Sequence, residues 1–222
     1  MLFSIFRRCL SSDVSMDVSV HDVDDDGALK ELHRASGGPW GVASVSSSFI
    51  AWLTQIAGNE VMKKLDEEIL VYEDFRTEIQ LKLRQSFSEN KKVVKLQISC
   101  SQAFSEGGFL INIEKMNLKE DVKLHHGYLI ISAHIFLSWV QEPISNGIRH
   151  ISGILSQPAM NDVDTILFVG EFAKCPLVQE KANEAFKNKT IVIPAYPAEA
   201  VVNGAVVCGH HGPYYLKHLR EK

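Results

Sequence analysis

The chain has 222 residues, of which 45% are hydrophobic, enough for one large domain or two small ones. Its 14 glycines and 7 prolines make up less than a tenth of the length, which excludes collagen-like and generally disordered classes. The formal net charge of −4 gives no electrostatic footprint for a nucleic-acid backbone or an anionic membrane. We therefore expect neither nucleic acid nor membrane as a partner.

Two further features bear on compartment and metal content. The apolar stretch over 127–141 is shorter than the roughly 18 residues of a membrane-spanning helix, and it contains His134. The cysteines are widely spaced and form no CxxC pair: Cys9, Cys100, Cys175 and Cys208. This spacing predicts reduced thiols, no bound metal and a cytoplasmic location. Residues 1–13 are expected to be an irregular start.

The first elements read as a β-hairpin. Val14, Met16, Val18 and Val20 alternate with polar residues, which predicts a half-buried strand. Residues 24–27 (DDDG) supply a turn, and 28–35 would return as the second strand. The aspartates here lack the spacing of a calcium loop. A glycine-rich loop is then expected over 36–41, with these glycines: Gly37, Gly38 and Gly41.

Two helices follow. The serines at 46–48 offer an N-cap, an apolar stripe runs from Phe49 to Ile56, and Gly58 ends the first helix. The second is expected over 70–87, with its apolar stripe on Tyr72, Phe75, Ile79 and Leu83 and a Glu78–Lys82 pair on the charged side.

The middle of the chain reads as a smaller mixed block. The pattern predicts strands at 94–100 and 109–113, and then a helix that is capped by Ser132, kinked or broken by Pro143, and resumed toward Leu155. We expect 59–131 to be an inserted subdomain between two core segments, 14–58 and 132–209, with a tail over 210–222.

The last third has a strand, turn, helix and strand order. An apolar run over 165–169 predicts a strand buried on both faces and paired on both sides, and Gly170 ends it. A helix over 176–186, a strand over 190–193 and an apolar, buried helix over 198–208 are expected next. This order defines an α/β architecture.

The segment DTILFVGEFAKCPLVQEKANEAF resembles the adenosine-contacting segment of the superfamily that unites the seventy-kilodalton heat-shock proteins with actin-like ATPases. More narrowly, GALKELHRASGGPWG and PAEAVVNGAVVCG look like the atypical branch of these heat-shock proteins known as the protein 12 family. The resemblance runs in one order from Met16 to Gly209. It implies the second lobe of an actin-like, ribonuclease H-like ATPase fold with an inserted α+β subdomain, in a protein related to chaperones and the stress response.

The resemblance also implies a nucleotide site for ATP or ADP with Mg²⁺. Four residues after the buried strand would border the adenosine: Gly170, Glu171, Phe172 and Ala173. The glycines at 37, 38 and 41 would lie near the phosphates, because glycine lets backbone approach a phosphate closely. Lys82 and Arg84 would face the adenine or ribose edge.

Three departures from the family pattern limit this expectation. Glu171 replaces a second glycine and adds a negative charge. The helix segment IQLKLR keeps Lys82 and Arg84 but loses an acidic residue and a lysine. The family's amino-terminal phosphate loop is matched in this chain only by Ser15 and Asp17. We therefore assign no catalytic residue.

We therefore expect a partial ATP-binding lobe, truncated and not hydrolytic alone. Its other lobe would be supplied by a longer product, by a partner chain, or not at all. The alternative is a nucleotide-independent interaction module on a degenerate lobe. A dinucleotide-dependent oxidoreductase is disfavoured, since no GxGxxG follows a strand.

Overall fold

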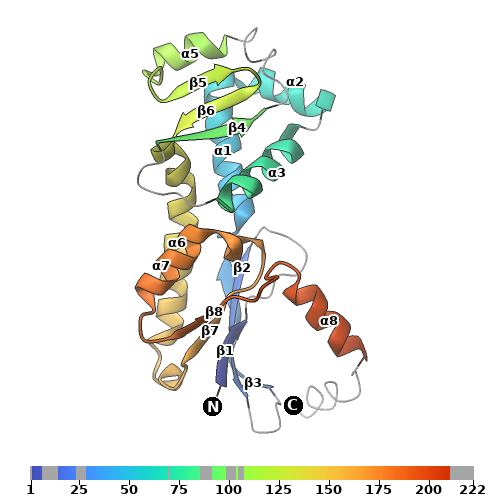
Figure 1. Cartoon of the computed structure of the whole chain (residues 1–222), viewed down its shortest axis with the longest axis vertical. Coiled ribbons are helices and arrows are strands. Elements are labelled where there is room, and N and C mark those ends of the chain that lie inside the picture. Colours follow the sequence, from blue (N-terminus) through green and yellow to red (C-terminus); the bar gives the residue numbers. More distant parts are fainter. Residues whose placement is uncertain are drawn as a thin grey trace. The chain divides into compact units, whose positions relative to one another are not determined.

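The computed structural model covers the whole chain and describes residues 2–6, 15–23, 29–69, 71–85, 92–98, 104 and 108–210 (Figure 1). The chain divides into two compact units. Unit 1 combines Met1–Gly41 with Ile144–Lys222, and unit 2 is Val42–Pro143. Unit 2 thus interrupts unit 1 in sequence. The domain boundaries expected from the sequence stay a prediction.

Unit 1 contains an antiparallel sheet in the order β1 (Leu2–Phe6), β2 (Met16–Val23) and β3 (Leu29–Gly38). The predicted hairpin of β2 and β3 is confirmed, with Val18 and Val20 buried. The expected turn at 24–27 lies outside the described residues. The irregular start was wrong for 2–6, because an apolar segment there pairs with β2 as a third strand.

The glycine-rich loop expected at 36–41 was wrong for its first half. Gly37 and Gly38 belong to β3, where they pair with Asp17 and Met16. A Cβ added to Gly37 would fall 1.8 Å from the Met16 carbonyl oxygen. Glycine is therefore what lets β3 continue against the start of β2.

The carboxyl-terminal part of unit 1 confirms the predicted strand, helix and strand order. β7 (Thr165–Leu167) and β8 (Thr190–Val192) pair in parallel, with α7 (Pro176–Ala185) between them in sequence. Among the described residues β7 forms a ladder with β8 alone, while β1 lies next to it, so pairing on both sides is confirmed for one side only (Figure 1). The expected burial is confirmed for Ile166, Phe168 and Val169.

Two longer helices differ from expectation. α6 (Ala133–Leu155) is one continuous helix that contains Pro143, so of the predicted kink or break the break was wrong. Buried apolar residues on both sides of the proline, such as Val140 and Ile144, supply packing that offsets the one lost hydrogen bond. α8 (Ala200–His210) is helical as predicted, but it is exposed rather than buried.

In unit 2, α1 (Val42–Ala57) begins before the predicted serine cap. The Ser46 hydroxyl lies inside the helix and donates to the Val42 carbonyl. The apolar stripe is confirmed, and Gly58, with a φ of 91°, follows the helix. α2 (Asn59–Ile69) comes next. In α3 (Val71–Leu83) Phe75, Ile79 and Leu83 are buried as predicted, with Val71 in place of Tyr72.

A three-stranded antiparallel sheet completes unit 2, in the order β4 (Val93–Gln97), β6 (Tyr128–Ser132) and β5 (Val122–His125). The strand predicted at 109–113 was wrong, because this segment is helix α5 (Phe109–Lys115). Its buried residues, Phe109 and Ile113, are four apart, while Leu110 and Ile111 are exposed. A short apolar run does not by itself distinguish a strand from one helical face.

No helix of the described residues is both long and apolar enough to cross a bilayer.

Candidate functional site

One end of the unit 1 sheet brings together two of the segments that the sequence singled out. β1 and β3 are both antiparallel to β2, so they run in the same direction. Figure 1 shows β7 running in that direction too, beside β1. Gly38 at the end of β3 and Gly170 after β7 therefore lie at the same end of unit 1. Ligands of open α/β sheets bind at such carboxyl ends.

Gly170 turns the chain out of the sheet. Its φ of 92° is in the region that favours glycine. The Gly170 N–H donates to the Pro197 carbonyl at 2.6 Å, and its own carbonyl accepts from the Ala173 N–H at 3.2 Å. The 3₁₀ turn η2 (Glu171–Lys174) follows at once. The glycine is thus required by the turn itself, and the turn presents backbone at the end of β7.

Glu171 is not an isolated negative charge. Its carboxylate lies 3.1 Å from the Lys174 ammonium, and the two side chains are only 11% and 24% exposed. Lys174 also lies 3.9 Å from Glu199, in the segment before α8. The sequence analysis missed this pairing, although an acid and a lysine three apart in a helical turn were its signal. The charge that Glu171 adds to this end of the sheet is therefore largely offset.

Phe172 and Ala173 contribute their side chains to the core rather than to the surface. They are 4% and 0% exposed. The Ala173 carbonyl accepts a hydrogen bond from the Gln179 side-chain amide at 2.8 Å. Next to them, burial raises the pKa of the Cys175 thiol, which keeps it protonated and unreactive. A ligand at this turn would meet backbone, not these two side chains.

The glycines at the end of β3 are explained by contacts within the protein. Gly37 faces the Met16 carbonyl, as described above. A Cβ added to Gly38 would lie 2.7 Å from the Trp40 ring, and the Trp40 N–H donates to the Gly38 carbonyl at 2.8 Å. Gly41 is buried where the chain enters α1. The close approach that these glycines permit is therefore made by protein atoms in this structure.

Lys82 and Arg84 belong to unit 2. The predicted Glu78–Lys82 pair is confirmed at 3.0 Å, and both side chains are largely buried. The same Glu78 oxygen accepts the Gln97 backbone N–H at 2.8 Å, which ties α3 to β4. Arg84 is exposed just after α3. Lys82 thus has a structural role within unit 2.

Asp17 places a carboxylate at the start of β2, beside the glycines of β3. It pairs with Gly37 across the ladder, and it accepts a hydrogen bond from the Ser15 hydroxyl at 3.0 Å. The described residues contain no cluster of three or more His, Cys, Asp or Glu side chains able to hold a metal. Mg²⁺ is commonly bound by one or two carboxylates together with substrate phosphates. A single half-buried aspartate fits a nucleotide-borne Mg²⁺, not a separate metal centre.

These features define a mixed α/β chain compatible with an actin-like fold, with a glycine turn and an aspartate at one sheet end. The chain is 24% identical to mouse heat shock 70 kDa protein 12A over 203 residues, and 26% identical to human heat shock 70 kDa protein 12B over 213 residues. Each match covers 88% of this chain and 30% of the relative. No protein-family model matches the chain. The resemblance inferred from the sequence is confirmed: the chain carries a region similar to part of these two heat-shock proteins.

Proposed function

We propose that this chain is the second lobe of an actin-like ATPase related to the 12A and 12B heat-shock proteins, and that it contacts ATP or ADP with Mg²⁺ together with a first lobe. The observation that carries the proposal is the placement of the Gly38 and Gly170 segments at one end of the unit 1 sheet. The similarity to the 12A and 12B proteins supports the relationship. A span of about 30% of their length agrees with one lobe of a larger protein. The parent activity would be nucleotide-dependent switching of a chaperone-related protein.

In this proposal the backbone after Gly170 borders the nucleoside and Asp17 faces the phosphate-bound Mg²⁺. Phosphoryl transfer depends on positioning and charge neutralisation around the phosphates. The segment before Asp17 lacks the glycines that would wrap them. Purified chain with Mg²⁺ and ATP is therefore expected to show no hydrolysis above a buffer blank.

The decisive experiment is ADP binding with Mg²⁺ measured by calorimetry. Glu171→Gly should tighten ADP binding, because it removes crowding at the turn and frees the Lys174 ammonium for an anionic ligand. Since Lys174 already offsets the carboxylate, we expect roughly tenfold, about 1.4 kcal/mol. Asp17→Asn should weaken binding in the presence of Mg²⁺ only.

Glu180→Gln is the matched control for these variants. Glu180 is exposed on α7 and outside the turn, so its change should leave ADP binding unaltered. Equal effects of Glu171→Gly and Glu180→Gln would mean that only net charge matters, which contradicts a site at Gly170.

The alternative is a nucleotide-independent interaction module. One observation in its favour is that protein atoms already occupy the space beside Gly37 and Gly38. Another is the exposed apolar surface of α8, where Val202 and Val206 are 64% and 54% exposed. No ADP binding in the wild-type chain and in Glu171→Gly would select this alternative.

A further inference from the structure

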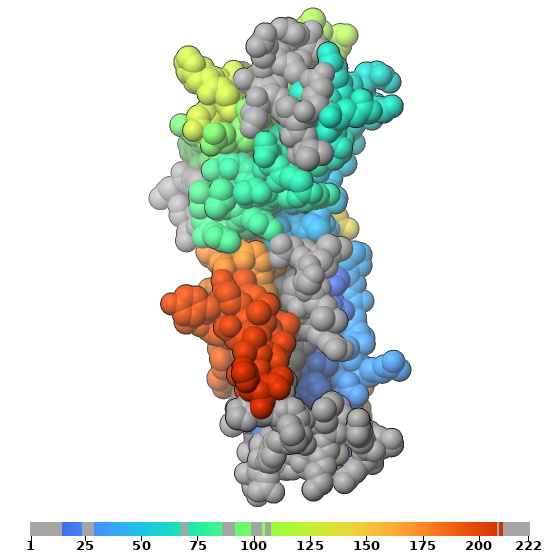
Figure 2. Space-filling model, turned by 90° about the vertical axis from the view of Figure 1, so that its right-hand side faces the viewer, coloured from blue at the N-terminus to red at the C-terminus, as the bar shows by residue number. Residues whose placement is uncertain are grey.

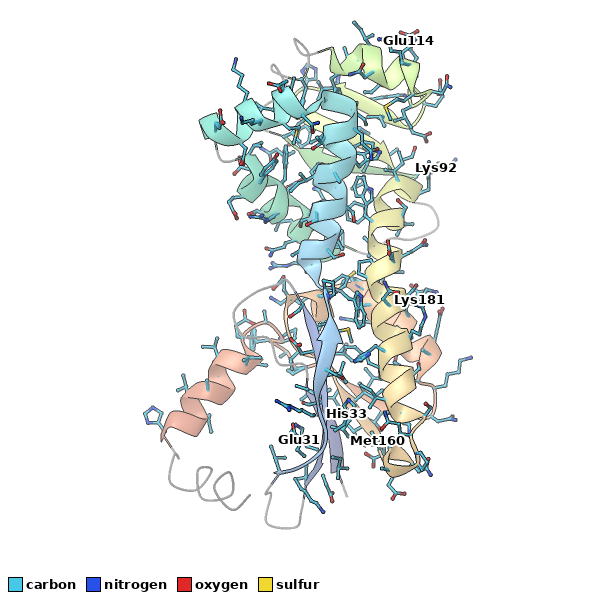
Figure 3. All side chains as sticks on the ribbon, turned by 180° about the vertical axis from the view of Figure 1, so that it is seen from behind. Glu31, His33, Lys92, Glu114, Met160 and Lys181 are labelled. Atoms are coloured by element: carbon cyan, nitrogen blue, oxygen red, sulfur yellow. The ribbon has the colours of Figure 1, made fainter. Side chains whose placement is uncertain are left out.

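A separate polar cluster lies in unit 1 where β3 meets α6. The His33 Nε2 and the His150 Nε2 each lie 3.0 Å from the Ser36 hydroxyl oxygen. His33 and Ser36 belong to β3, while His150 comes from α6, 114 positions beyond Ser36. Figure 3 labels His33 on β3, beside α6. The fold thus directs two imidazole nitrogens from distant segments at one oxygen.

The Ser36 hydroxyl can hydrogen-bond to both imidazoles at once. A serine hydroxyl has one proton and two lone pairs. The hydroxyl can therefore donate to one imidazole and accept from the other, with the roles set by the tautomer of each ring. The cluster of His33, Ser36 and His150 contains none of the residues of the proposed nucleotide site. Nucleotide binding at that site therefore does not account for the cluster.

The cluster forms one side of a pocket of about 420 Å³. Besides the three clustered residues, the lining supplies an indole, two amides and a guanidinium, from Trp40, Asn146, Gln157 and Arg149. The exposed Arg149 donates to the Asn146 side-chain oxygen at 3.0 Å, which holds both at the rim. The described residues that line the pocket include no carboxylate. This lining therefore offers many donors and a permanent positive charge.

These properties favour an anion over a cation. Two imidazoles can begin a zinc or nickel site, but such sites usually add further thiolate, imidazole or carboxylate ligands. Within the described part of the chain the lining adds neither a carboxylate nor a thiol, and the Arg149 charge repels a metal ion. Arginine and several converging donors are instead the groups that bind phosphate.

The lining of the pocket also includes the aromatic ring of Trp40. The ring centroids of Trp40 and His150 lie 5.3 Å apart with an interplanar angle of 57°. A volume of about 420 Å³ is within the range of small-molecule sites and exceeds what a lone phosphate needs. We propose that this pocket binds a small phosphate monoester with a flat apolar group, its phosphate toward Arg149 and the Ser36 cluster and its flat group against Trp40.

Phenyl phosphate and inorganic phosphate are suitable probes for the whole chain. Binding is followed through the imidazole nitrogen signals of His33 and His150 by NMR. Phenyl phosphate should shift both signals and bind more tightly than inorganic phosphate, roughly threefold to tenfold, because of the aromatic contact. Arg149→Ala should weaken phenyl phosphate roughly tenfold. This variant leaves the core intact because Arg149 is exposed.

Arg34→Ala is the matched control. Arg34 follows His33 on β3, is exposed, and does not line the pocket. Equal losses in Arg149→Ala and Arg34→Ala, or no imidazole shift with either probe, would overturn the proposal. Tighter binding of Ni²⁺ than of phenyl phosphate at the same two histidines would overturn it as well. ADP that binds the chain without displacing phenyl phosphate would show that this pocket and the proposed nucleotide site are independent.

Discussion

Helices α1 and α8 are both rich in apolar residues, but the chain buries only one of them. In α1 the apolar residues form a stripe, and Val45, Phe49 and Leu53 are at most 1% exposed. In α8 they occur all around the helix, and Val202 and Val206 are more than half exposed. Figure 1 shows α8 standing apart from the sheet of its own unit.

The difference shows that the described part of the chain buries the apolar residues of α1 but not those of α8. A helix that is apolar on every side is normally buried on every side. α1 meets its partners within unit 2, from α3 and α6. The described residues of unit 1 do not cover α8 in the same way (Figure 2). This exposed apolar surface of α8 is the feature that favours the interaction-module alternative.

The largest expected effect tests the buried side of the comparison. Phe49 is 1% exposed, and its ring contacts those of Phe75 and Trp139 at centroid distances of 5.3 and 5.4 Å. Phe49→Ala should lower the free energy of unfolding of unit 2 by about 3–5 kcal/mol. Urea unfolding followed by tryptophan fluorescence measures this, because Trp52 and Trp139 both lie in unit 2.

Leu110→Ala is the control for Phe49→Ala. Leu110 is 52% exposed on α5, so its truncation should change the free energy of unfolding by no more than about 0.5 kcal/mol. A comparable loss in both variants would mean that unit 2 does not pack around Phe49.

The second prediction concerns the glycines of unit 1. Gly37→Ala would place a Cβ against the Met16 carbonyl, so β3 must move away from β2. We expect a loss of roughly 1–3 kcal/mol in the free energy of unfolding, measured by chemical denaturation.

Gly153→Ala provides the contrast. Gly153 lies within α6, and no neighbouring atom of the described residues comes within 4 Å of an added Cβ. Alanine there should stabilise the helix by up to about 1 kcal/mol. Destabilisation by Gly153→Ala as large as that by Gly37→Ala would remove the steric explanation for Gly37.

Elements with a long, regular pattern were the ones that the sequence could predict. The α3 stripe, the alternation of β4 and the β7–α7–β8 order depend on neighbours along the chain. The misassigned features depend on contacts that local pattern does not contain. The continuation of β3 through Gly37 needs Met16, the helical state of 109–113 needs the buried faces of Phe109 and Ile113, and the exposure of α8 needs the rest of unit 1.

The candidate site divides in the same way. The position of Gly170 at a strand end follows from an apolar run and a glycine, so it could be predicted. The burial of Phe172 and the Glu171–Lys174 pair could not be predicted with equal certainty, because a 3₁₀ turn sets them. The cluster of His33, Ser36 and His150 was missed because its members come from segments far apart in the sequence and form no local motif.

A smaller effect is expected from His21 on β2. Burial lowers the pKa of His21 below its ordinary value of 6.5, and nearby Glu31 opposes this shift. The unfolded chain therefore binds a proton more readily than the folded chain. The stability contributed by neutral His21 should be present above pH 6.5 and decline as the pH falls from 6.5 toward the lowered folded value.

His21→Gln should flatten this part of the stability curve between pH 8 and 5. The difference between the wild-type and variant curves, from urea titrations at each pH, isolates His21 from the other histidines. A difference that does not change with pH would show that His21 titrates alike in the folded and unfolded chain.

The smallest effect on stability is expected from Val206→Ser on α8, and this variant tests the difference between α1 and α8 most directly. Val206 is 54% exposed and Val45 is fully buried in α1, so one substitution made at both positions compares the two helices directly. Val45→Ser should cost about 2–3 kcal/mol of unfolding free energy, because it removes buried apolar area and adds a buried hydroxyl. Val206→Ser should change it by no more than about 0.5 kcal/mol.

Sedimentation at rising concentration should show less self-association for Val206→Ser than for wild type, since exposed apolar surface drives association. If Val206→Ser instead destabilises the chain as strongly as Val45→Ser, α8 is packed within unit 1, and its support for the interaction-module alternative is lost.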